Sequence, residues 1–538
     1  MNQRPDAIII HGFQERFRGD VLLPGGAGYD EARQIWNAMI DRKPALIARC
    51  KSAADVVQAV EFGRTNNLVI SIKGGGHNIA GNAVCDDGIM IDMSPMKRVD
   101  VDPKARTAKV EPGCTLADFD KAAQAHGLAT PLGINSTTGV AGLTLGGGFG
   151  WLSRKYGMTV DNLLAADVVT ADGRQVRASE KEHADLFWGL RGGGCNFGVV
   201  TSFEYQLHPV GPNVLSGLIV YPFDQAKSVL TEFARFTQTM PEELNVWMVT
   251  RQAPPLPFLP AAVHGKEIVA LALCYAGDPA VGEKLIEPLR KFGTPHGEHV
   301  GVQPYTAWQQ AFDPLLAPGA RNYWKSHNFS ELSEGVIDMI VKYAGALPGP
   351  QCEIFVGTIG GKTTAAKPDA MAYSSRDAKY VMNVHGRWDS AAEDAKGMAW
   401  AREFFAKSQP YASAGAYINF LTQEEADRVM FAYGGTYKRL VEVKRKYDPT
   451  NLFRMNQNIK PALKRNAVSL RPSQRTRRDV VRRAPAMHRQ HHGGQEEQTW
   501  RGQNGGSAVP SKTCRRFFSP SRTSCFKCAR ASAKWLTD

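Results

Sequence analysis

The sequence lacks the long hydrophobic run that a membrane-spanning helix requires. Its 538 residues are 43% hydrophobic and 22% charged, and no apolar stretch approaches the ~18 residues that a span needs. The cysteines before residue 464 show no regular spacing, so neither a disulfide framework nor a zinc site is expected. The N-terminal apolar stretch, Ala7 to Ile10, is too short for a signal-peptide core. We therefore expect a cytoplasmic protein that binds neither metal nor membrane.

An excess of one charge is also absent from most of the chain. The net charge is +13, with 65 Lys and Arg against 52 Asp and Glu. From Lys464 onward there are 17 basic and 4 acidic residues, which leaves 48 of each sign before it. Because that segment is also rich in Ser, Pro and Gln, we expect a basic disordered tail at 464–538. The body of the protein is therefore not expected to bind nucleic acid.

A nucleic-acid-binding protein remains a remote alternative because of this tail. Cys525 and Cys528 form a single Cys-x-x-Cys pair, and one pair cannot complete a tetrahedral zinc site. A disordered basic tail would bind any polyanion weakly and in a salt-dependent way.

Glycine, by contrast, is abundant and clustered. Of the 52 glycines, nine form three Gly-Gly-Gly clusters within about 120 residues, at 74–76, 146–148 and 192–194. Glycine in regular structure costs about 0.5–1 kcal/mol relative to alanine, so three clusters need a reason. Each could be a tight turn. Together they favour a long cofactor whose pyrophosphate lies against bare backbone N–H groups.

Neither of two familiar phosphate motifs is present. The glycine clusters lack the Gly-x-Gly-x-x-Gly spacing, after a strand and before a helix, that identifies a Rossmann domain. The segment Gly357 to Thr363 resembles a P-loop, but three residues rather than four separate Gly357 from Gly361. We interpret it as the end of a strand followed by a turn.

Local signals divide the chain into an α/β part and a second lobe. Ser52 with Asp55 predicts a helix that ends at 66–67 and precedes a strand at 68–72. Thr115 predicts the start of another helix, and Asp172-Gly173 predicts a hairpin turn. From 214 to 420 glycine clusters are few, which indicates a separate lobe. A helix is predicted within 433–453, ended by Asp448-Pro449.

His77 stands in the loop Lys73-Gly74-Gly75-Gly76-His77-Asn78-Ile79-Ala80-Gly81, where little else could reach a ligand. This segment resembles the flavin-attachment loop of FAD-linked oxidases of the vanillyl-alcohol-oxidase superfamily, in the berberine-bridge-enzyme-like group. Blocks at 139–162, 190–201 and 446–459 are similar to the family's other FAD loops and closing segment. The resemblance covers about residues 40–463. It implies an FAD bonded to His77 through the flavin 8α carbon.

The resemblance also implies the fold and the cofactor contacts. The expected class is α+β: a two-subdomain FAD-binding lobe of the PCMH type at 40–210, a substrate lobe with an antiparallel sheet covered by helices at 214–424, and a berberine-bridge-like segment at 425–463 that returns to the FAD lobe. The residues implied at the cofactor are Lys73, Gly74, Gly75, Gly76, His77, Asn78, Gly81, Gly133, Thr138, Gly139, Gly142, Gly146, Asp161, Asn162, Gly198, Val200, Asn456 and Asn458.

One position departs from the family pattern. Many members carry a second covalent link from a cysteine in a Gly-x-Cys-Pro-Thr-x-Gly loop, and Asn135 stands at that position in the segment 133–139. An amide cannot form the thioether. We therefore predict a single link through His77, as in monocovalent members similar to 6-hydroxy-D-nicotine oxidase. Thr138 stands at the family's oxygen gate, where a side chain of its size implies access for dioxygen.

Tyr417 is the candidate catalytic residue. The segment Gly415 to Phe420 resembles the family's Tyr-x-Asn-Tyr strand, whose tyrosine points at the substrate side of the flavin. A phenol with a pKa near 10 is a poor base at neutral pH, so a cation or the flavin would have to lower it. The alternative is a tyrosine packed between the two lobes.

Together these features predict an FAD-dependent oxidoreductase. It is expected to oxidise an alcohol or amine carbon of a small secondary metabolite, ring compound or sugar by hydride transfer to the flavin, with dioxygen as the acceptor and hydrogen peroxide as the product. A dehydrogenase of the same fold, with a quinone or protein as electron acceptor, is the alternative. The sequence leaves the substrate and the oligomeric state open.

Overall fold

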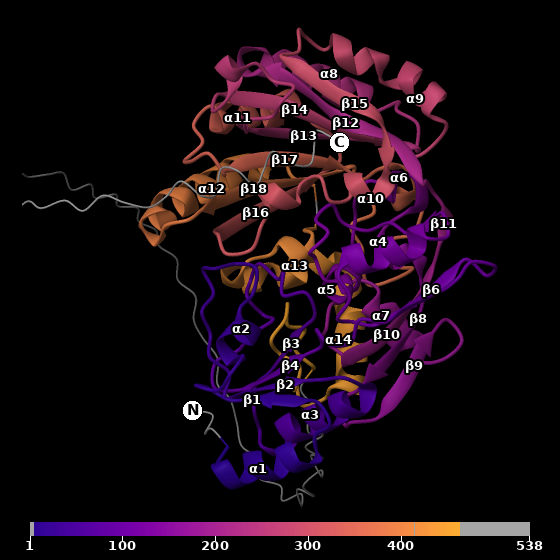
Figure 1. Cartoon of the computed structure of the whole chain (residues 1–538), viewed down its shortest axis with the longest axis vertical. Helices are drawn as coiled ribbons and strands as arrows, with labels where there is room; N and C mark the ends of the chain where they lie inside the picture. Colours follow the sequence, from indigo (N-terminus) through magenta and orange to yellow (C-terminus); the bar gives the residue numbers. More distant parts are fainter. Residues whose placement is uncertain (1–4, 414, 463–538) are drawn as a thin grey trace, which may run out of the picture. The chain divides into compact units, whose positions relative to one another are not determined.

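The computed structural model describes residues 5–413 and 415–462, which belong to one unit ending at Ala462 (Figure 1). The predicted tail at 464–538, with its Cys525 and Cys528, lies outside the described residues. No helix within the described ranges is long and apolar enough to cross a membrane.

The first subdomain of the FAD lobe is a four-stranded sheet in the order β1-β2-β4-β3, in which β2, β4 and β3 are parallel. Its elements are α1 (Ala7–Arg16), β1 (Asp20–Leu22), α2 (Tyr29–Arg33), β2 (Leu46–Arg49), α3 (Ala53–Thr65), β3 (Ile70–Lys73) and β4 (Ile89–Asp92). The Ser52 hydroxyl caps α3 as predicted. Phe13 and Phe17 enter the same core, so the folded lobe begins before residue 40.

The second subdomain is a five-stranded antiparallel sheet in the order β5-β6-β10-β8-β9. Its elements are β5 (Val99–Asp102), β6 (Thr107–Val110), α4 (Leu116–Gln124), β8 (Leu163–Val169), β9 (Gln175–Ser179), α7 (Ala184–Leu190) and β10 (Val199–Gln206). Thr115 and Asp118 form a capping box that starts α4, and β8 pairs with β9 across the predicted turn at Gly173. The local signals in this region are confirmed.

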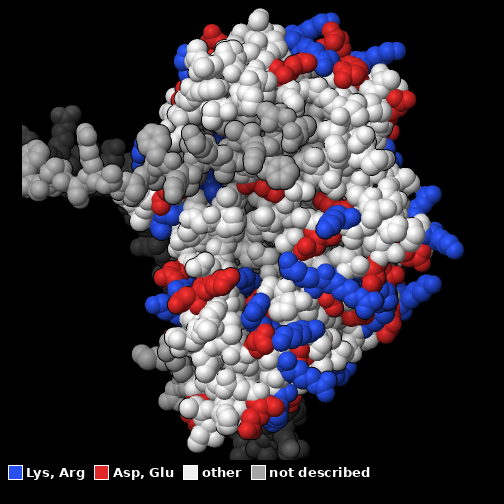
Figure 2. All heavy atoms as spheres, in the orientation of Figure 1, with Lys and Arg blue, Asp and Glu red and all other residues white. Residues whose placement is uncertain are grey.

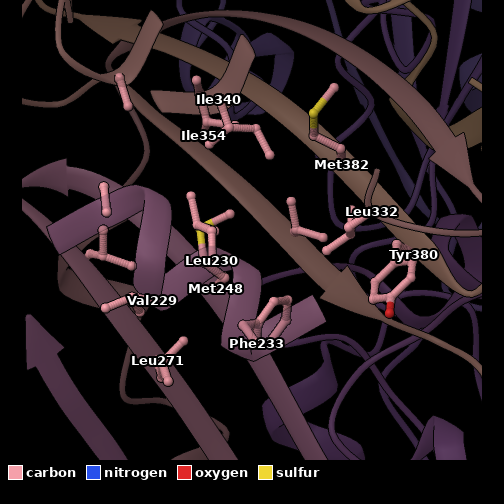
Figure 3. Packing of buried hydrophobic residues seen from close by; sticks show 14 of the residues in the cluster. Val229, Leu230, Phe233, Met248, Leu271, Leu332, Ile340, Ile354, Tyr380 and Met382 are labelled. Atoms are coloured by element: carbon pink, nitrogen blue, oxygen red, sulfur yellow. The ribbon is translucent and has the colours of Figure 1, made fainter. Parts of the chain in front are cut away.

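The second lobe is a seven-stranded antiparallel sheet in the order β15-β12-β14-β13-β17-β18-β16. Its strands are β12 (Asn213–Pro222), β13 (Leu244–Gln252), β14 (Glu267–Tyr275), β15 (Gly297–Pro304), β16 (Arg321–Phe329), β17 (Glu353–Thr358) and β18 (Tyr380–Trp388). Three helices, α8 (Ala226–Phe236), α11 (Glu334–Ala344) and α12 (Asp394–Ser408), cover one face. Leu230 and Phe233 of α8 pack there against Met248 of β13 (Figure 3).

Strand alternation gives the sheet a second face of different character. On β18, Met382 and Val384 enter the helix-covered core, whereas Val381 packs in a cluster with Tyr417 and Trp247. Because side chains alternate along a strand, Asn383 and His385 share the face of Val381. The α+β class and the helix-covered antiparallel sheet are confirmed.

The shorter elements connect these layers. They are α5 (Val140–Leu145), α6 (Ser153–Tyr156), α9 (Pro279–Ile286), α10 (Tyr305–Trp308), the paired strands β7 (Leu128–Ala129) and β11 (His208–Pro209), and 3₁₀ helices that include η5 (Asp313–Leu315), η6 (Gly361–Thr364) and η9 (Ile418–Phe420). The P-loop-like segment is the end of β17 followed by η6, as predicted. The Tyr417 segment forms the η9 turn instead of the expected strand.

The C-terminal segment returns to the FAD lobe. It forms α13 (Val429–Tyr433) and α14 (Tyr437–Tyr447), and Gly434 between them has a positive φ of 51°. Helix α14 is the helix predicted within 433–453. Helix α14 lies beside α7 (Figure 1) and ends before Asp448-Pro449. The Lys444 ammonium is fully buried and donates to Asp448 Oδ2 at 2.7 Å, to Asn196 O at 2.7 Å and to Phe453 O at 2.8 Å. One cation thus ties the returning segment to the third glycine loop.

The surface of this part of the chain carries both charges. On the face shown in Figure 2, basic and acidic side chains lie intermingled. This agrees with the equal numbers of the two signs before Lys464.

We expect Lys444→Met to lower the free energy of unfolding by about 3–5 kcal/mol, because it leaves the buried Asp448 carboxylate without its cation. Lys446→Met is the matched control: Lys446 pairs with Asp185 two residues along the same helix, but its side chain is 60% exposed, and such pairs contribute about 0–1 kcal/mol. Urea unfolding followed by tryptophan fluorescence measures both. Equal effects of the two substitutions would contradict the anchoring role of Lys444.

Candidate functional site

The three glycine loops meet at one place. A Cβ on Gly75 would lie 2.3 Å from the backbone nitrogen of Gly139, so the first and second loops touch backbone to backbone. The Gly194 N–H donates to Leu145 O at 2.9 Å, which joins the third loop to the second. More than forty residues of sequence separate each loop from the next, and the fold brings them together.

The second loop leaves open space beside its helix. Gly142 is exposed, and a Cβ added to it would meet nothing within 4 Å. At Gly146, by contrast, a Cβ would lie 2.2 Å from the Asn419 amide. Close packing thus requires glycine at Gly146, whereas at Gly142 a side chain would meet no neighbour.

The C-terminal segment adds polar groups to the third loop. Asn196 donates through Nδ2 to Gly193 O at 2.8 Å and Gln457 O at 3.1 Å, and its Oδ1 accepts from the Ile459 N–H at 2.9 Å. Two side-chain oxygens predicted to contact the cofactor, those of Asn456 and Asn458, are buried without a hydrogen-bond partner among the described residues. Buried polar atoms normally have partners, so these two oxygens indicate a missing ligand.

His77 is held as a neutral ring beside the meeting point of the loops. Its Nε2 lies 2.9 Å from the Thr137 hydroxyl, and Trp36 stacks on its face at 5.2 Å between ring centroids. Burial lowers the His77 pKa to about 4, while part of the side chain remains accessible. A neutral imidazole has one nitrogen with a free lone pair, which is the form that acts as a nucleophile.

Trp36 was missed by the sequence reasoning because it precedes the predicted start of the FAD lobe. Its N–H donates to Gly76 O at 3.0 Å and its indole N–H to Leu316 O at 2.7 Å. It therefore connects the loop 73–81, which carries His77, to the second lobe. A tryptophan in a segment without periodic hydrophobicity carries no sequence signal of this role.

The face of the large sheet opposite the helices presents aromatic and polar side chains. Trp324, Phe355 and Phe420 are half-buried, and Phe420 makes edge contacts with the other two at 5.2 and 6.1 Å. Trp324 also contacts Trp36 at 5.5 Å and His385 at 5.1 Å. The contacts Phe420–Trp324–Trp36–His77 thus lead from this sheet to the His77 loop.

Polar side chains without partners lie on the same face. Asn383 pairs in register with Ser326 and with Phe355. The Asn383 amide nitrogen and oxygen and the Ser326 hydroxyl are buried, and no residue of the described ranges bonds to them. Leaving such groups unsatisfied costs about 1–3 kcal/mol each, which favours a polar ligand or water beside them.

Tyr417 does not have the environment of a base. It is buried, and its hydroxyl accepts hydrogen bonds from Gly148 N–H and Asn419 Nδ2, both at 3.1 Å. Burial raises the Tyr417 pKa to about 12, and no cation contacts its ring within the described part of the chain. Of the two groups that could lower this pKa, a cation or the flavin, no cation lies on the Tyr417 ring among the described residues, and the role of Tyr417 as a base stays a prediction. The phenol keeps its proton at neutral pH and can donate it in a hydrogen bond.

The other predicted residues divide by what they contact. The Lys73 ammonium donates to Ala32 O at 2.6 Å and Gln34 O at 2.9 Å. Asp161 pairs with Arg376 at 2.6 Å, and the Asn162 amide binds Tyr156 O, Met158 O and the His208 ring. Protein partners thus occupy the polar groups of all three.

Backbone positions account for the rest of the predicted set. In the first loop, Gly74 and Gly76 flank the Gly75 contact, and Asn78 Oδ1 accepts from the Asn82 N–H next to the turn at Gly81. Gly133 and Thr138 belong to the second loop. Gly198 and Val200 lie at the start of β10. These positions present main chain rather than charge, as expected for residues that line a bound dinucleotide.

The residues present fit a flavin dinucleotide. Three glycine loops expose bare backbone, Asn456 and Asn458 offer oxygens that no described residue bonds, and His77 is a neutral ring. No cluster of His, Cys, Asp and Glu that could hold a metal ion occurs among the described residues.

Comparison with known proteins agrees with this site. The profile of an FAD binding domain matches residues 44–179, and that of berberine and berberine-like proteins matches 416–460. An FAD-linked oxidoreductase of Dictyostelium discoideum is 32% identical over 466 residues, which cover 86% of this chain and 99% of that protein. (R)-6-hydroxynicotine oxidase of Paenarthrobacter nicotinovorans is 32% identical over 459 residues, which cover 82% and 97% of the two chains.

Solved structures show the same fold. The crystal structure of 6-hydroxy-D-nicotine oxidase from Arthrobacter nicotinovorans matches with a TM-score of 0.74 and 28% identity, covering 83% of this chain and 98% of that one. A chitooligosaccharide oxidase matches with a TM-score of 0.74 and 25% identity, covering 85% and 100%.

We expect Gly75→Ala to lower the free energy of unfolding by more than about 2 kcal/mol, because its Cβ would meet the backbone of Gly139 and force the two loops apart. Gly142→Ala is the matched control. Its Cβ enters open space, so the apoprotein should keep its stability within about 1 kcal/mol. Urea unfolding of both apoproteins tests this, and an unchanged Gly75→Ala variant would contradict the close approach.

Proposed function

The chain belongs to the berberine-bridge-like FAD-linked oxidoreductases, and on that premise we propose that it is an oxidase of a small ring compound with FAD attached covalently at His77. Dioxygen is the proposed electron acceptor and hydrogen peroxide the product. The observation that carries this proposal is the neutral His77 ring at the meeting point of the glycine loops, connected through Trp36 to the aromatic face of the large sheet.

The cofactor would be held mainly by main-chain groups. When bound, FAD supplies the two-electron acceptor that takes hydride from a substrate carbon. The glycine loops would provide backbone N–H donors for its phosphates, and Asn456 and Asn458 would provide acceptor oxygens. The ammonium groups of Lys73 and Lys444 are engaged by protein carbonyls, so these lysines leave phosphate binding to the backbone.

The substrate would lie against the sheet face opposite the helices. Trp324, Phe355 and Phe420 offer an apolar surface for a ring, and Asn383 with Ser326 offers both donors and acceptors. A flat molecule with one polar edge fits this combination, because the rings exclude water while the amide fixes the orientation. This supports a ring compound over a long oligosaccharide.

The protonation of Tyr417 favours an amine over an alcohol. Oxidation of an alcohol requires a base to take the hydroxyl proton, whereas a neutral amine can release hydride from the adjacent carbon with its own lone pair. With its pKa raised to about 12, Tyr417 remains a phenol. We propose that it acts as a hydrogen-bond donor at the site, held in place by Gly148 and Asn419.

The alternative dehydrogenase would differ only in its electron acceptor. Thr138 is half-buried, and its position in the second loop supports access for dioxygen. Reoxidation of the substrate-reduced protein by air, followed as hydrogen peroxide release, distinguishes the oxidase from a dehydrogenase that needs a quinone or a protein.

We expect the yellow chromophore of the purified protein to stay in the pellet after acid precipitation, because a covalent bond survives unfolding. In His77→Ala the colour should pass into the supernatant. His299→Ala is the control, since His299 is exposed on β15, and it should behave as the wild type. Release of the flavin from wild type would exclude covalent attachment.

We expect Asn383→Leu to separate stability from activity. Removing an unpartnered buried amide should leave the free energy of unfolding unchanged or raise it by about 1 kcal/mol. The same change should lower kcat/KM by about 10-fold or more for substrates found by peroxide release, because the polar edge of the substrate loses its partner. Val381→Leu on the same face is a steric control. A loss of stability without a change in kcat/KM would contradict a role for Asn383 in substrate binding.

A further inference from the structure

Asn135, Thr137 and His77 form a hydrogen-bonded series within the second and first loops. The Asn135 side-chain oxygen accepts from the Thr137 backbone N–H at 3.1 Å and is 2.7 Å from the Thr137 hydroxyl. The same hydroxyl lies 2.9 Å from His77 Nε2. Asn135 is only 8% exposed, so water does not readily replace these bonds.

The direction of each bond follows from counting protons. The Thr137 backbone N–H can only donate, so the Asn135 atom that it meets is the carbonyl oxygen and not the amide nitrogen. That oxygen carries no hydrogen, so the Thr137 hydroxyl must donate its single proton to it. Toward His77 the hydroxyl can therefore only accept, and Nε2 of His77 must carry a hydrogen.

The remaining nitrogen of His77 is then free. Since the ring is neutral, a proton on Nε2 leaves a lone pair on Nδ1. No residue within the described ranges bonds to Nδ1, and Trp36 fixes the ring plane by stacking. The loop itself is fixed from the other lobe, because Asp313 of η5 accepts from the Ser136 N–H at 2.9 Å and from the Ser136 hydroxyl at 2.5 Å.

We propose that Asn135 acts through Thr137 to hold His77 in the tautomer with its proton on Nε2, and so presents the Nδ1 lone pair for the bond to the flavin. Asn135 and Thr137 are then positioning residues. The use of the lone pair rests on the proposed covalent attachment, whereas the tautomer itself does not. Asn135 stands where many family members carry the cysteine of a second flavin link. In this chain it would instead orient His77, the residue of the first link.

Asparagine suits this task because of its chemistry. Its amide oxygen is an acceptor that cannot donate, so it leaves the Thr137 hydroxyl a single orientation. Without that oxygen the hydroxyl could rotate and donate its proton to His77 Nε2. The hydrogen on the imidazole would then move to Nδ1, and the nucleophilic lone pair would be lost from that nitrogen.

Attachment forms one bond, from Nδ1 to the carbon of the flavin 8α methyl group, and breaks one C–H bond of that methyl group. The methyl proton leaves to solvent, and the electron pair of the C–H bond passes into the flavin ring. The imidazole, now a cation with carbon on Nδ1, releases its Nε2 proton to solvent. Dioxygen then takes these two electrons with two protons and becomes hydrogen peroxide, which restores the oxidised flavin.

The test uses the full chain produced without flavin in a riboflavin-auxotrophic host. Asn135→Leu removes the acceptor at similar size, and Thr137→Val removes the hydroxyl at similar shape. Asn135→Asp and Thr137→Ser are the matched controls that keep each group. The ring nitrogens of ¹⁵N-histidine-labelled protein report the tautomer by NMR, with His77→Gln used to assign the signals. FAD is then added, and attachment is followed as acid-stable flavin over time.

In wild type and Thr137→Ser, Nδ1 of His77 should show the unprotonated signal. In Asn135→Leu and Thr137→Val, that signal should shift toward the protonated form, and attachment should slow by about 3–10-fold, the effect of one hydrogen bond. Asn135→Asp should keep the wild-type tautomer. Reversible FAD binding by the variants, measured before attachment, should stay within about twofold.

The experiment distinguishes failure of the proposed covalent attachment from failure of the proposed positioning role of Asn135 and Thr137. A wild type that binds FAD only reversibly would exclude covalent attachment, and the NMR signals would still decide the tautomer. A wild type that attaches FAD, with an unchanged tautomer and rate in both Asn135→Leu and Thr137→Val, would overturn the positioning role. Two independent variants protect the test against one that does not fold.

Discussion

The contact between two bare backbones, at Gly75 and Gly139, is the constraint on which the rest of the site depends. No side chain fits between these loops, since even a Cβ on Gly75 would lie 2.3 Å from the neighbouring backbone nitrogen. This close approach places Thr137 against His77, because the two residues stand two positions from the touching glycines. The hydrogen bond that sets the state of the imidazole is therefore a consequence of glycine packing.

Burial then determines the chemistry that these residues can perform. It keeps His77 neutral and Tyr417 protonated, so the site contains a nucleophilic ring and a hydrogen-bond donor but lacks an ionised phenol. The same exclusion of water leaves Asn383 and Ser326 without hydrogen-bond partners among the residues that the structure describes. A site of this kind recognises a substrate by shape and hydrogen bonding and leaves the transfer of electrons to its cofactor.

The two lobes hold the site through elements at both ends of the folded chain. Trp36 connects the His77 loop to the second lobe, and Lys444 connects the returning segment to the third glycine loop. Neither residue would be ranked as functional by its type alone. A tryptophan in an irregular segment and a lysine in a helix normally face solvent in part, and here each is almost completely buried.

The sequence by itself determined the elements whose causes are local. Ser52 and Thr115 begin helices because a side-chain oxygen caps the first free N–H groups, and Gly173 forms the turn of a hairpin. The glycine loops and His77 can be recognised in the sequence because each motif spans only a few neighbouring residues. The tertiary structure alone decided which loops touch, that the folded lobe begins before residue 40, and that Tyr417 is buried without a cation. It also decided the proposed role of Asn135, because the sequence shows only that this position lacks the cysteine thiol of other family members. Hydrogen-bond direction and pKa depend on neighbours distant in the chain, and no local pattern encodes those neighbours.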